Sequence, residues 1–232
     1  ADNMAIHVDA IFAEGVDLTN TILVWWGTLC FGIQIYCDFS AYSDIAIGSA
    51  LLLGIRLPEN FRTPYAARSP QDFWRRWHIS LSTWLRDYLY ISLGGSRKGQ
   101  RRLYFALMTT MALGGLWHGA SWNFVLWGII HGIILIAHRL LIKIQIITKI
   151  FESDTWKKPA VLCGWIITQI LIFFTWLIFR VEDSELLVES MRGFLFLDQT
   201  FNIDAALEAL PSVRYLTFAL VFIFIIAHGV SG

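Results

Sequence analysis

Charge and cysteine are both scarce in this chain of 232 residues. Only 16% of the residues are charged, whereas soluble domains average about 25%. The 18 basic and 18 acidic side chains cancel, so no excess of one sign points to a charged partner. The three cysteines form no CxxC pair and no cluster with histidine. These features argue against a disordered chain, a nucleic-acid binder and a small disulfide-linked module.

Apolar and aromatic residues are abundant instead. The apolar share is 56%, the aromatic share is 15%, and the chain holds 11 Trp and 17 Phe. The mean hydropathy is +0.56. This composition favours an integral membrane protein. The cysteines Cys30, Cys37 and Cys163 each lie in an apolar stretch, so we expect buried free thiols.

A helix that crosses a bilayer needs about 20 mostly apolar residues, within a range of about 17–25. We expect five stretches to enter the membrane. They are Thr21–Tyr36, Leu103–Trp117, Trp122–Ala137, Ala160–Phe179 and Tyr215–Val230. Ile45–Ile55 is too short to cross, so we expect a re-entrant or interfacial segment there. The predicted fold class is an all-α integral membrane protein, a multi-span helical bundle with re-entrant and interfacial helices.

The balanced charge hides a segregation along the chain. Residues 1–20 carry four acidic residues and neither Lys nor Arg, whereas residues 56–102 carry ten basic and three acidic residues. Residues 138–159 are basic, five against two, and residues 180–213 are acidic, seven against two. Because basic loops stay in the cytoplasm, we expect the two basic segments inside and the two acidic ones outside. This topology requires residues 103–137 to enter the membrane and return.

The basic segment contains a recognisable helix start. Ser69 suits the N-cap, Pro70 suits the first turn, and Asp72 lies near the positive end of the helix dipole. Apolar side chains then recur every three or four residues. They are Phe73, Trp77, Leu81, Trp84, Leu85 and Tyr88. The pattern predicts one amphipathic helix at the headgroup level, followed by a turn at Gly94–Gly99.

Ionisable residues within a membrane protein are functional hypotheses by default. His118 lies in the run GGLWHGASW, between two apolar stretches. A break at membrane depth must be surrounded by protein or line a cavity, so we expect His118 in a recess, as a site residue or as a hinge histidine bonded to a carbonyl. For His78, an interfacial position and a site position are both open. His131 and His138 share one helix face, where packing is the more common role.

Other motifs of known chemistry are absent from the sequence. There is no HExxH, no GxSxG, no GxxxxGK[ST] and no strand-associated GxGxxG. No histidine or cysteine spacing suits a metal, so we expect no metal site and no bound cofactor. Asp38 and Asp44 are interpreted as a helix N-cap and a pore-side acid, or as markers of the membrane edge.

Several long motifs occur in order and resemble the bacterial membrane-bound O-acyltransferase family. They are YCDFSAYSDIAIG at 36–48, GIRLPENF at 54–61, FWRRWHISLSTWLRDY at 73–88 and GGLWHGASW at 114–122. The similarity runs from about Thr21 to Arg139 and is greatest to the alginate O-acetyltransferase branch of the family. Teichoic acid D-alanyl transfer proteins are more distant. The resemblance implies one partial family domain over 1–232, with motifs in 21–139 and C-terminal spans in 160–232.

The resemblance also implies roles for single residues. His118 matches the family's catalytic histidine, and His78 matches its second signature position. Ala106 stands where many relatives carry Asn, so polar support differs there. Because family members are longer and this chain begins with Ala1, we expect an internal or C-terminal piece that lacks N-terminal helices. The acids Asp38 and Asp44 and the amide of Asn123 are candidates to orient the His118 imidazole.

The implied activity is transfer of an acetyl group from a cytoplasmic donor, acetyl-CoA or another acyl thioester, to hydroxyls of an exported polysaccharide. Alginate is the expected acceptor, with cellulose, peptidoglycan and teichoic acid as alternatives. The implied setting is a bacterial inner membrane, with lipid and partner acetyltransferase subunits of the periplasm or membrane as neighbours and no nucleic acid. Two other classes stay open, namely a channel that relays acyl groups to a separate transferase and a transporter with broken helices.

Overall fold

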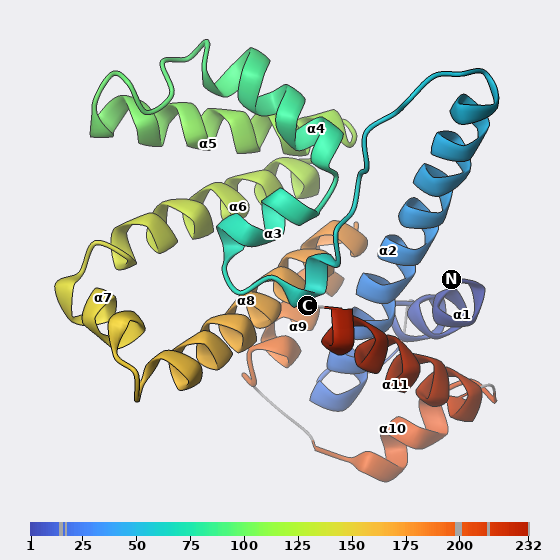
Figure 1. Cartoon of the computed structure of the whole chain (residues 1–232). Helices are drawn as coiled ribbons and strands as arrows, with labels where there is room; N and C mark the ends of the chain where they lie inside the picture. The colour runs from blue at the N-terminus through green and yellow to red at the C-terminus, as the bar shows by residue number, and fades with distance from the viewer. Residues whose placement is uncertain (14–15, 17, 198–200, 213, 232) are drawn as a thin grey trace. The chain divides into compact units, whose positions relative to one another are not determined.

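The computed structural model describes residues 1–13, 16, 18–197, 201–212 and 214–231. Over these residues the chain is helical and contains no β-strand, so the all-α prediction is confirmed (Figure 1). The helices are α1 (Asp2–Ile11), α2 (Thr21–Leu52), η1 (Pro64–Ala66), α3 (Pro70–Arg76), α4 (Ile79–Trp84), η2 (Leu85–Tyr90), α5 (Gln100–Trp117), α6 (Trp122–Leu141), α7 (Gln145–Glu152), α8 (Lys157–Arg180), α9 (Ser184–Phe194), α10 (Ile203–Ala209) and α11 (Arg214–Ser231). The acidic residues Glu14, Asp17 and Asp198 of the charge pattern lie outside the described residues.

Three of the described helices are long and apolar enough to cross a membrane, namely α2, α6 and α8. They include the predicted spans at 21–36, 122–137 and 160–179. The stretch 103–117 is helical in α5, but α5 does not meet the same criterion. The predicted C-terminal span forms α11, whose described part qualifies only together with α10.

The prediction of a separate short segment at Ile45–Ile55 is wrong. The chain continues from Thr21 to Leu52 as one helix of 32 residues. The acids Asp38 and Asp44 lie inside this helix with exposed side chains, so Asp38 is no N-cap. Because both side chains are exposed on the helix surface, neither carboxylate requires the helix to end there. It ends before Gly54, whose φ of +75° breaks the helical path.

The expectation of three buried thiols holds only for Cys30. Cys37 is half-buried and Cys163 is exposed, and all three are free. Cys163 lies on α8, a helix of membrane-spanning length whose apolar side chains are largely exposed. An apolar face on such a helix needs no protein cover, because lipid is its solvent.

The chain divides into two compact units, residues 1–48 with 176–231 and residues 49–175. Contacts between α2 and α9, and an ion pair between α8 and α1, help to hold the first unit. Thr21 donates its hydroxyl to the carbonyl of Gly193 at 3.1 Å. The Trp25 indole donates to the carbonyl of Phe194 at 3.1 Å and stacks on its ring at 4.1 Å. Arg180 pairs with Asp9 of α1 at 2.7 Å.

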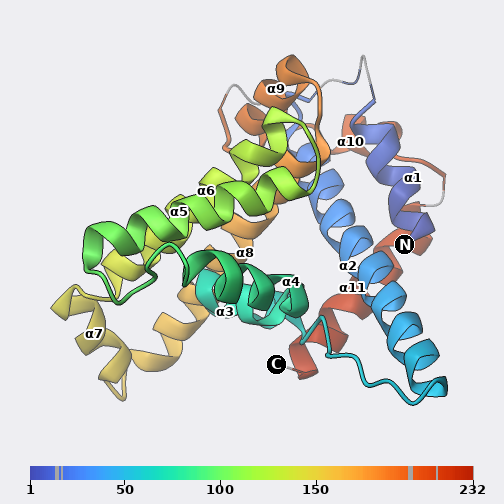
Figure 2. The ribbon, with the colours of Figure 1, turned by 90° about the horizontal axis from the view of Figure 1, so that it is seen from above.

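The second unit is built around the antiparallel pair α5 and α6, which lie side by side in Figures 1 and 2. Glycines let the two backbones touch. A Cβ on Gly115 would collide with the carbonyl oxygen of Phe124, and one on Gly128 would collide with that of Met111. A Cβ on Gly132 would lie 2.8 Å from the sulfur of Met108. The pair is therefore a helical hairpin that only small residues permit.

Candidate functional site

His78 lies at a break in the predicted amphipathic helix. The expected single helix over Phe73 to Tyr88 is wrong, since α3 ends at Arg76 and α4 begins at Ile79. His78 itself has φ +42° and ψ +57°, in the left-handed region that side-chain-bearing residues rarely adopt. Its side chain is buried, with 8% exposure. The break therefore turns His78 into the interior of the unit.

The start of this segment follows the sequence prediction. Ser69 is the N-cap of α3, and its hydroxyl accepts the backbone N–H of Asp72 at 3.2 Å. Pro70 occupies the first helical position. The Asp72 carboxylate pairs with Arg76 one turn later, at 2.9 Å. The cap, the proline and the ion pair fix the beginning of the segment that carries His78.

His118 lies in the short link between α5 and α6. It is the C-cap of α5, and its backbone N–H donates to the carbonyl of Gly115 at 3.0 Å. Its half-buried ring lies among aromatic rings of both helices. The ring centroids are 5.1 Å from Trp117, 5.3 Å from Trp127 and 6.1 Å from Phe124. The expectation of a recess within protein therefore agrees with this environment.

Trp117 joins the two predicted site histidines. Its ring lies 6.0 Å from the ring of His78 and 5.1 Å from that of His118, measured between centroids. Burial, together with the nearby charge of a protonated His118, lowers the pKa of His78 to about 4. Burial also lowers the pKa of His118. Both imidazoles are therefore neutral at pH 7 and able to accept a proton.

His131 belongs to a packed cluster behind His118. It is 1% exposed, and its Nδ1 accepts the indole N–H of Trp74 at 3.3 Å. Its ring lies 4.5 Å from Trp127, which in turn contacts His118. Because Nδ1 is the acceptor, the proton of the neutral ring is on Nε2. These contacts agree with the packing role that the sequence favoured for His131.

The remaining candidates lie on other elements or at the start of α6. Asp38 and Asp44 belong to the first unit, and the site histidines belong to the second. Asn123 lies in the first turn of α6, where its backbone N–H donates to the hydroxyl of Ser121 at 3.3 Å. Ala106 is buried in α5, and its carbonyl accepts the hydroxyl of Thr110 at 2.7 Å.

Three residues near the site were not predicted from the sequence. Trp74 and Trp127 surround His131, and Asn60 contacts the start of α4 just after His78. Trp127 lies four residues before His131, on the same face of α6. This spacing could have indicated the contact between the two side chains. The contact of Asn60 spans 20 residues of chain, and no local pattern signals it.

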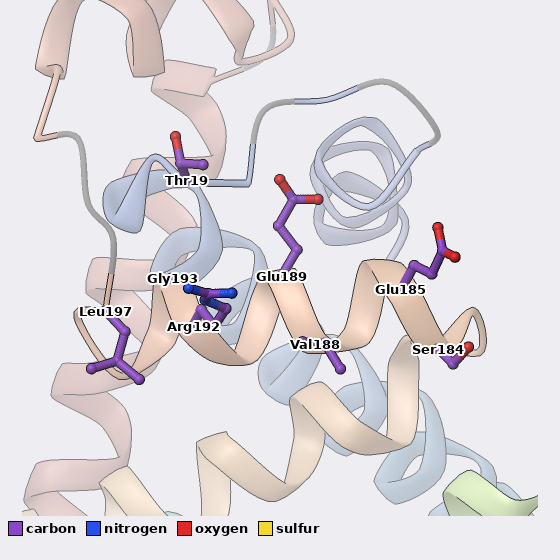
Figure 3. A pocket seen from close by; sticks show the side chains of 8 residues that line it. All are labelled: Thr19, Ser184, Glu185, Val188, Glu189, Arg192, Gly193 and Leu197. Carbon is purple, nitrogen blue, oxygen red and sulfur yellow. The ribbon is translucent and has the colours of Figure 1, made fainter.

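A separate hollow of about 660 Å³ lies on the first unit (Figure 3). It is lined by Thr19, Ser184, Glu185, Val188, Glu189, Arg192, Gly193 and Leu197. The carboxylates of Glu185 and Glu189 extend to the same side of α9 (Figure 3). None of the histidines discussed above lines it. The lining residues belong to the first unit, whereas His78 and His118 belong to the second.

The known proteins that this chain resembles are acyltransferases of one family. Residues 15–181 match the MBOAT, membrane-bound O-acyltransferase family. A protein of Azotobacter vinelandii named "Probable alginate O-acetylase AlgI" is 41% identical over 99% of this chain and 44% of its own length. A peptidoglycan O-acetyltransferase of Helicobacter pylori is 41% identical over 85% of this chain and 36% of its own length.

A more distant relative is a teichoic acid D-alanyltransferase of Bacillus subtilis, 29% identical over 54% of this chain and 34% of its own length. The chain thus spans less than half the length of each of these relatives. The family match covers the segments that carry His78 and His118. The chain belongs to the membrane-bound O-acyltransferase family.

Proposed function

We propose that the protein to which this chain belongs is a membrane O-acetyltransferase. It moves an acetyl group from a thioester donor, acetyl-CoA or another acyl thioester, to a hydroxyl group of an exported polysaccharide. The observation that carries this proposal is the meeting of His78 and His118 at Trp117, from two separate motifs of an acyltransferase family.

The chemistry follows from the neutral state of the two imidazoles. A sugar hydroxyl oxygen attacks the thioester carbonyl, and the ring nitrogen of His118 accepts the hydroxyl proton. The tetrahedral intermediate then collapses, the C–S bond breaks, and the thiolate leaves and takes up the proton. General-base catalysis of this kind supplies roughly 10²–10⁴ in rate. His78 contributes a second neutral acceptor beside the first, and burial keeps both pKa values low.

The acceptor that we propose is alginate. The Azotobacter relative named as a probable alginate O-acetylase is similar to this chain over 99% of this chain's length. The peptidoglycan relative is equally identical over a shorter stretch, so peptidoglycan is the main alternative acceptor. Acetate analysis of the exported polymer from a deletion strain decides between them. Loss of acetyl groups from alginate supports the proposal, and loss from peptidoglycan alone overturns this part of it.

The setting that we propose is the bacterial inner membrane. Helices of membrane-spanning length and the family match support a membrane location. The thioester donor is cytoplasmic and the polymer is exported, so the acetyl group must reach the outer side. We propose that acetyltransferase subunits of the periplasm or membrane act beside this protein at that stage.

The test uses the purified full-length protein in lipid nanodiscs with radiolabelled acetyl-CoA and deacetylated alginate. We expect release of free CoA together with labelled polymer, and loss of both in His118→Ala. Release of CoA without labelled polymer, with label held on the protein, would identify an acyl relay that needs a second transferase. A wild-type protein that consumes no thioester would refute the enzymatic assignment.

A further inference from the structure

The N-terminus of α4 is capped by Asn60, a residue that lies well before the helix in the sequence. A helix leaves its first N–H groups without partners inside the helix, and the side chain at the N-cap usually accepts one of them. His78 holds the N-cap position of α4, but its side chain makes no such bond. Instead, the carbonyl oxygen of Asn60 accepts the N–H of Ile79 at 3.0 Å. The side-chain oxygen of Asn60 accepts the N–H of Ser80 at 3.2 Å.

Further hydrogen bonds connect residues 60–63 to the chain on both sides of His78, where α3 and α4 are separated. The hydroxyl of Ser80 also donates to the Asn60 side-chain oxygen, at 2.6 Å. Before the break, the N–H of Arg62 donates to the carbonyl of Arg76 at 3.0 Å. The Arg76 guanidinium reaches the hydroxyl of Thr63 at 3.3 Å. Residues 60–63 therefore hold the chain immediately before and immediately after His78.

This bracing explains how His78 keeps an unfavourable backbone conformation. A φ of +42° brings the Cβ of a residue other than glycine close to its own carbonyl oxygen. Such a conformation persists only where the surrounding structure holds it. Ser, Thr, Asp or Asn is usual at an N-cap, whereas histidine is not among the preferred residues. Because Asn60 supplies the cap, the side chain of His78 is not needed to cap α4.

We propose that Asn60 is a positioning residue for His78. It replaces the missing N-cap of α4, fixes the left-handed turn at residue 78 and thereby holds the imidazole against Trp117 beside His118. This inference rests on the proposed function, because it treats His78 as part of the acyl-transfer site. Asn60 acts through hydrogen bonds to the backbone of Ile79 and Ser80 and is not assigned a contact with substrate.

The first readout is the rate of acetyl transfer by full-length variants in nanodiscs. Displacement of a catalytic group by about 1 Å costs roughly 100-fold in rate, and we expect a loss of this order in kcat for Asn60→Ala. Asn60→Asp keeps an oxygen acceptor at the same place and should recover most of the rate. Ser80→Ala keeps both backbone bonds and should stay close to the wild-type rate. Asn60→Ala at the wild-type rate, or no recovery in Asn60→Asp, would overturn the proposal.

The second readout does not depend on catalysis. Hydrogen–deuterium exchange should be faster in Asn60→Ala for the peptide over Trp77–Trp84, unchanged over α6, and close to wild type in Asn60→Asp. Unchanged exchange at Trp77–Trp84 would refute the cap itself. If His78→Ala abolishes transfer and Asn60→Ala does not, the positioning role fails while the proposed function stands. If exchange changes as expected but neither histidine affects transfer, the cap stands and the proposed function fails.

Discussion

His78 combines burial, a strained backbone and a low pKa in one residue. Its pKa falls from an unfolded value of about 6.5 to about 4, chiefly because the buried ring loses hydration when charged. Between these values the unfolded chain binds more protons at this residue than the folded chain does. The stability that the neutral ring supports is therefore complete above about pH 6.5 and declines as the pH falls toward 4.

This linkage predicts that acid destabilises the protein partly through His78. The melting temperature of the purified protein should fall between pH 6.5 and pH 4, and His78→Gln should show a shallower fall over the same range. Thermal unfolding in detergent at a series of pH values measures both slopes. Identical slopes for the wild type and His78→Gln would show that His78 is not one of the groups responsible.

The residues of the site differ in how far sequence could predict them. His118 stands out because it lies in a glycine-rich link between apolar stretches, and His78 matched a family motif. The break at His78 was not predictable, because Phe73, Trp77, Leu81 and Leu85 keep helical spacing across it. The hydrogen bonds that hold the break come from Asn60, which is distant in sequence. Local periodicity contains no information on such a contact.

At the scale of elements, the α5–α6 hairpin fixes the position of His118. The link between the helices is short, and the glycines bring the two backbones into contact on either side of it. Any change that separates the helices also moves the His118 ring away from Trp127 of the facing helix. Hairpin packing and site geometry are therefore coupled.

This coupling predicts a large effect for Gly128→Ala. The new methyl group would collide with the Met111 carbonyl, and backbone cannot yield as a flexible side chain does. Overpacking of this kind costs roughly 1–3 kcal/mol, and we expect reduced thermal stability together with reduced acetyl transfer. Gly48→Ala is the matched control, because a Cβ at this position of α2 would have no atom within 4 Å. That control should be neutral or stabilising by up to about 1 kcal/mol, and equal effects of the two substitutions would contradict the packing argument.

The elements also show where sequence prediction was reliable. Ser69, Pro70 and Asp72 predicted the start of α3, because capping is a local interaction. The long apolar stretches predicted α6 and α8, because hydropathy is also a local property of the sequence. The length of α2 was underestimated because the polar residues around Asp38 and Asp44 suggested an end that the continuous helix does not have. Polar side chains mark a helix end only when they bond to the backbone.

At the scale of the whole molecule, the number of crossings decides the topology. If α2, α6 and α8 alone crossed, the basic segment 138–159 and the basic segment 56–102 would lie on opposite sides. The tight packing of α5 on α6 argues that both enter together and return, although α5 is less apolar. This arrangement satisfies the positive-inside rule for both basic segments.

Cysteine labelling of spheroplasts tests this topology. Cys30, Cys37 and Cys163 are first replaced, and a single cysteine is then placed at Lys149 or Glu185. An impermeant maleimide should label Glu185→Cys in intact spheroplasts and Lys149→Cys only after the membrane is opened. Labelling of Lys149→Cys in intact spheroplasts would contradict the α5–α6 excursion and favour three separate crossings.

The most direct test of the account compares His118→Ala with His131→Ala in the full-length protein. Both histidines contact Trp127, and His118 also contacts Trp117, which in turn contacts His78. Transfer of labelled acetyl to polymer is measured per amount of folded protein in the membrane. The account predicts that His118→Ala abolishes transfer while the protein stays inserted and abundant, and that His131→Ala keeps most of it. Normal transfer by His118→Ala, or an equal loss in His131→Ala, would contradict the assignment of the chemistry to His118.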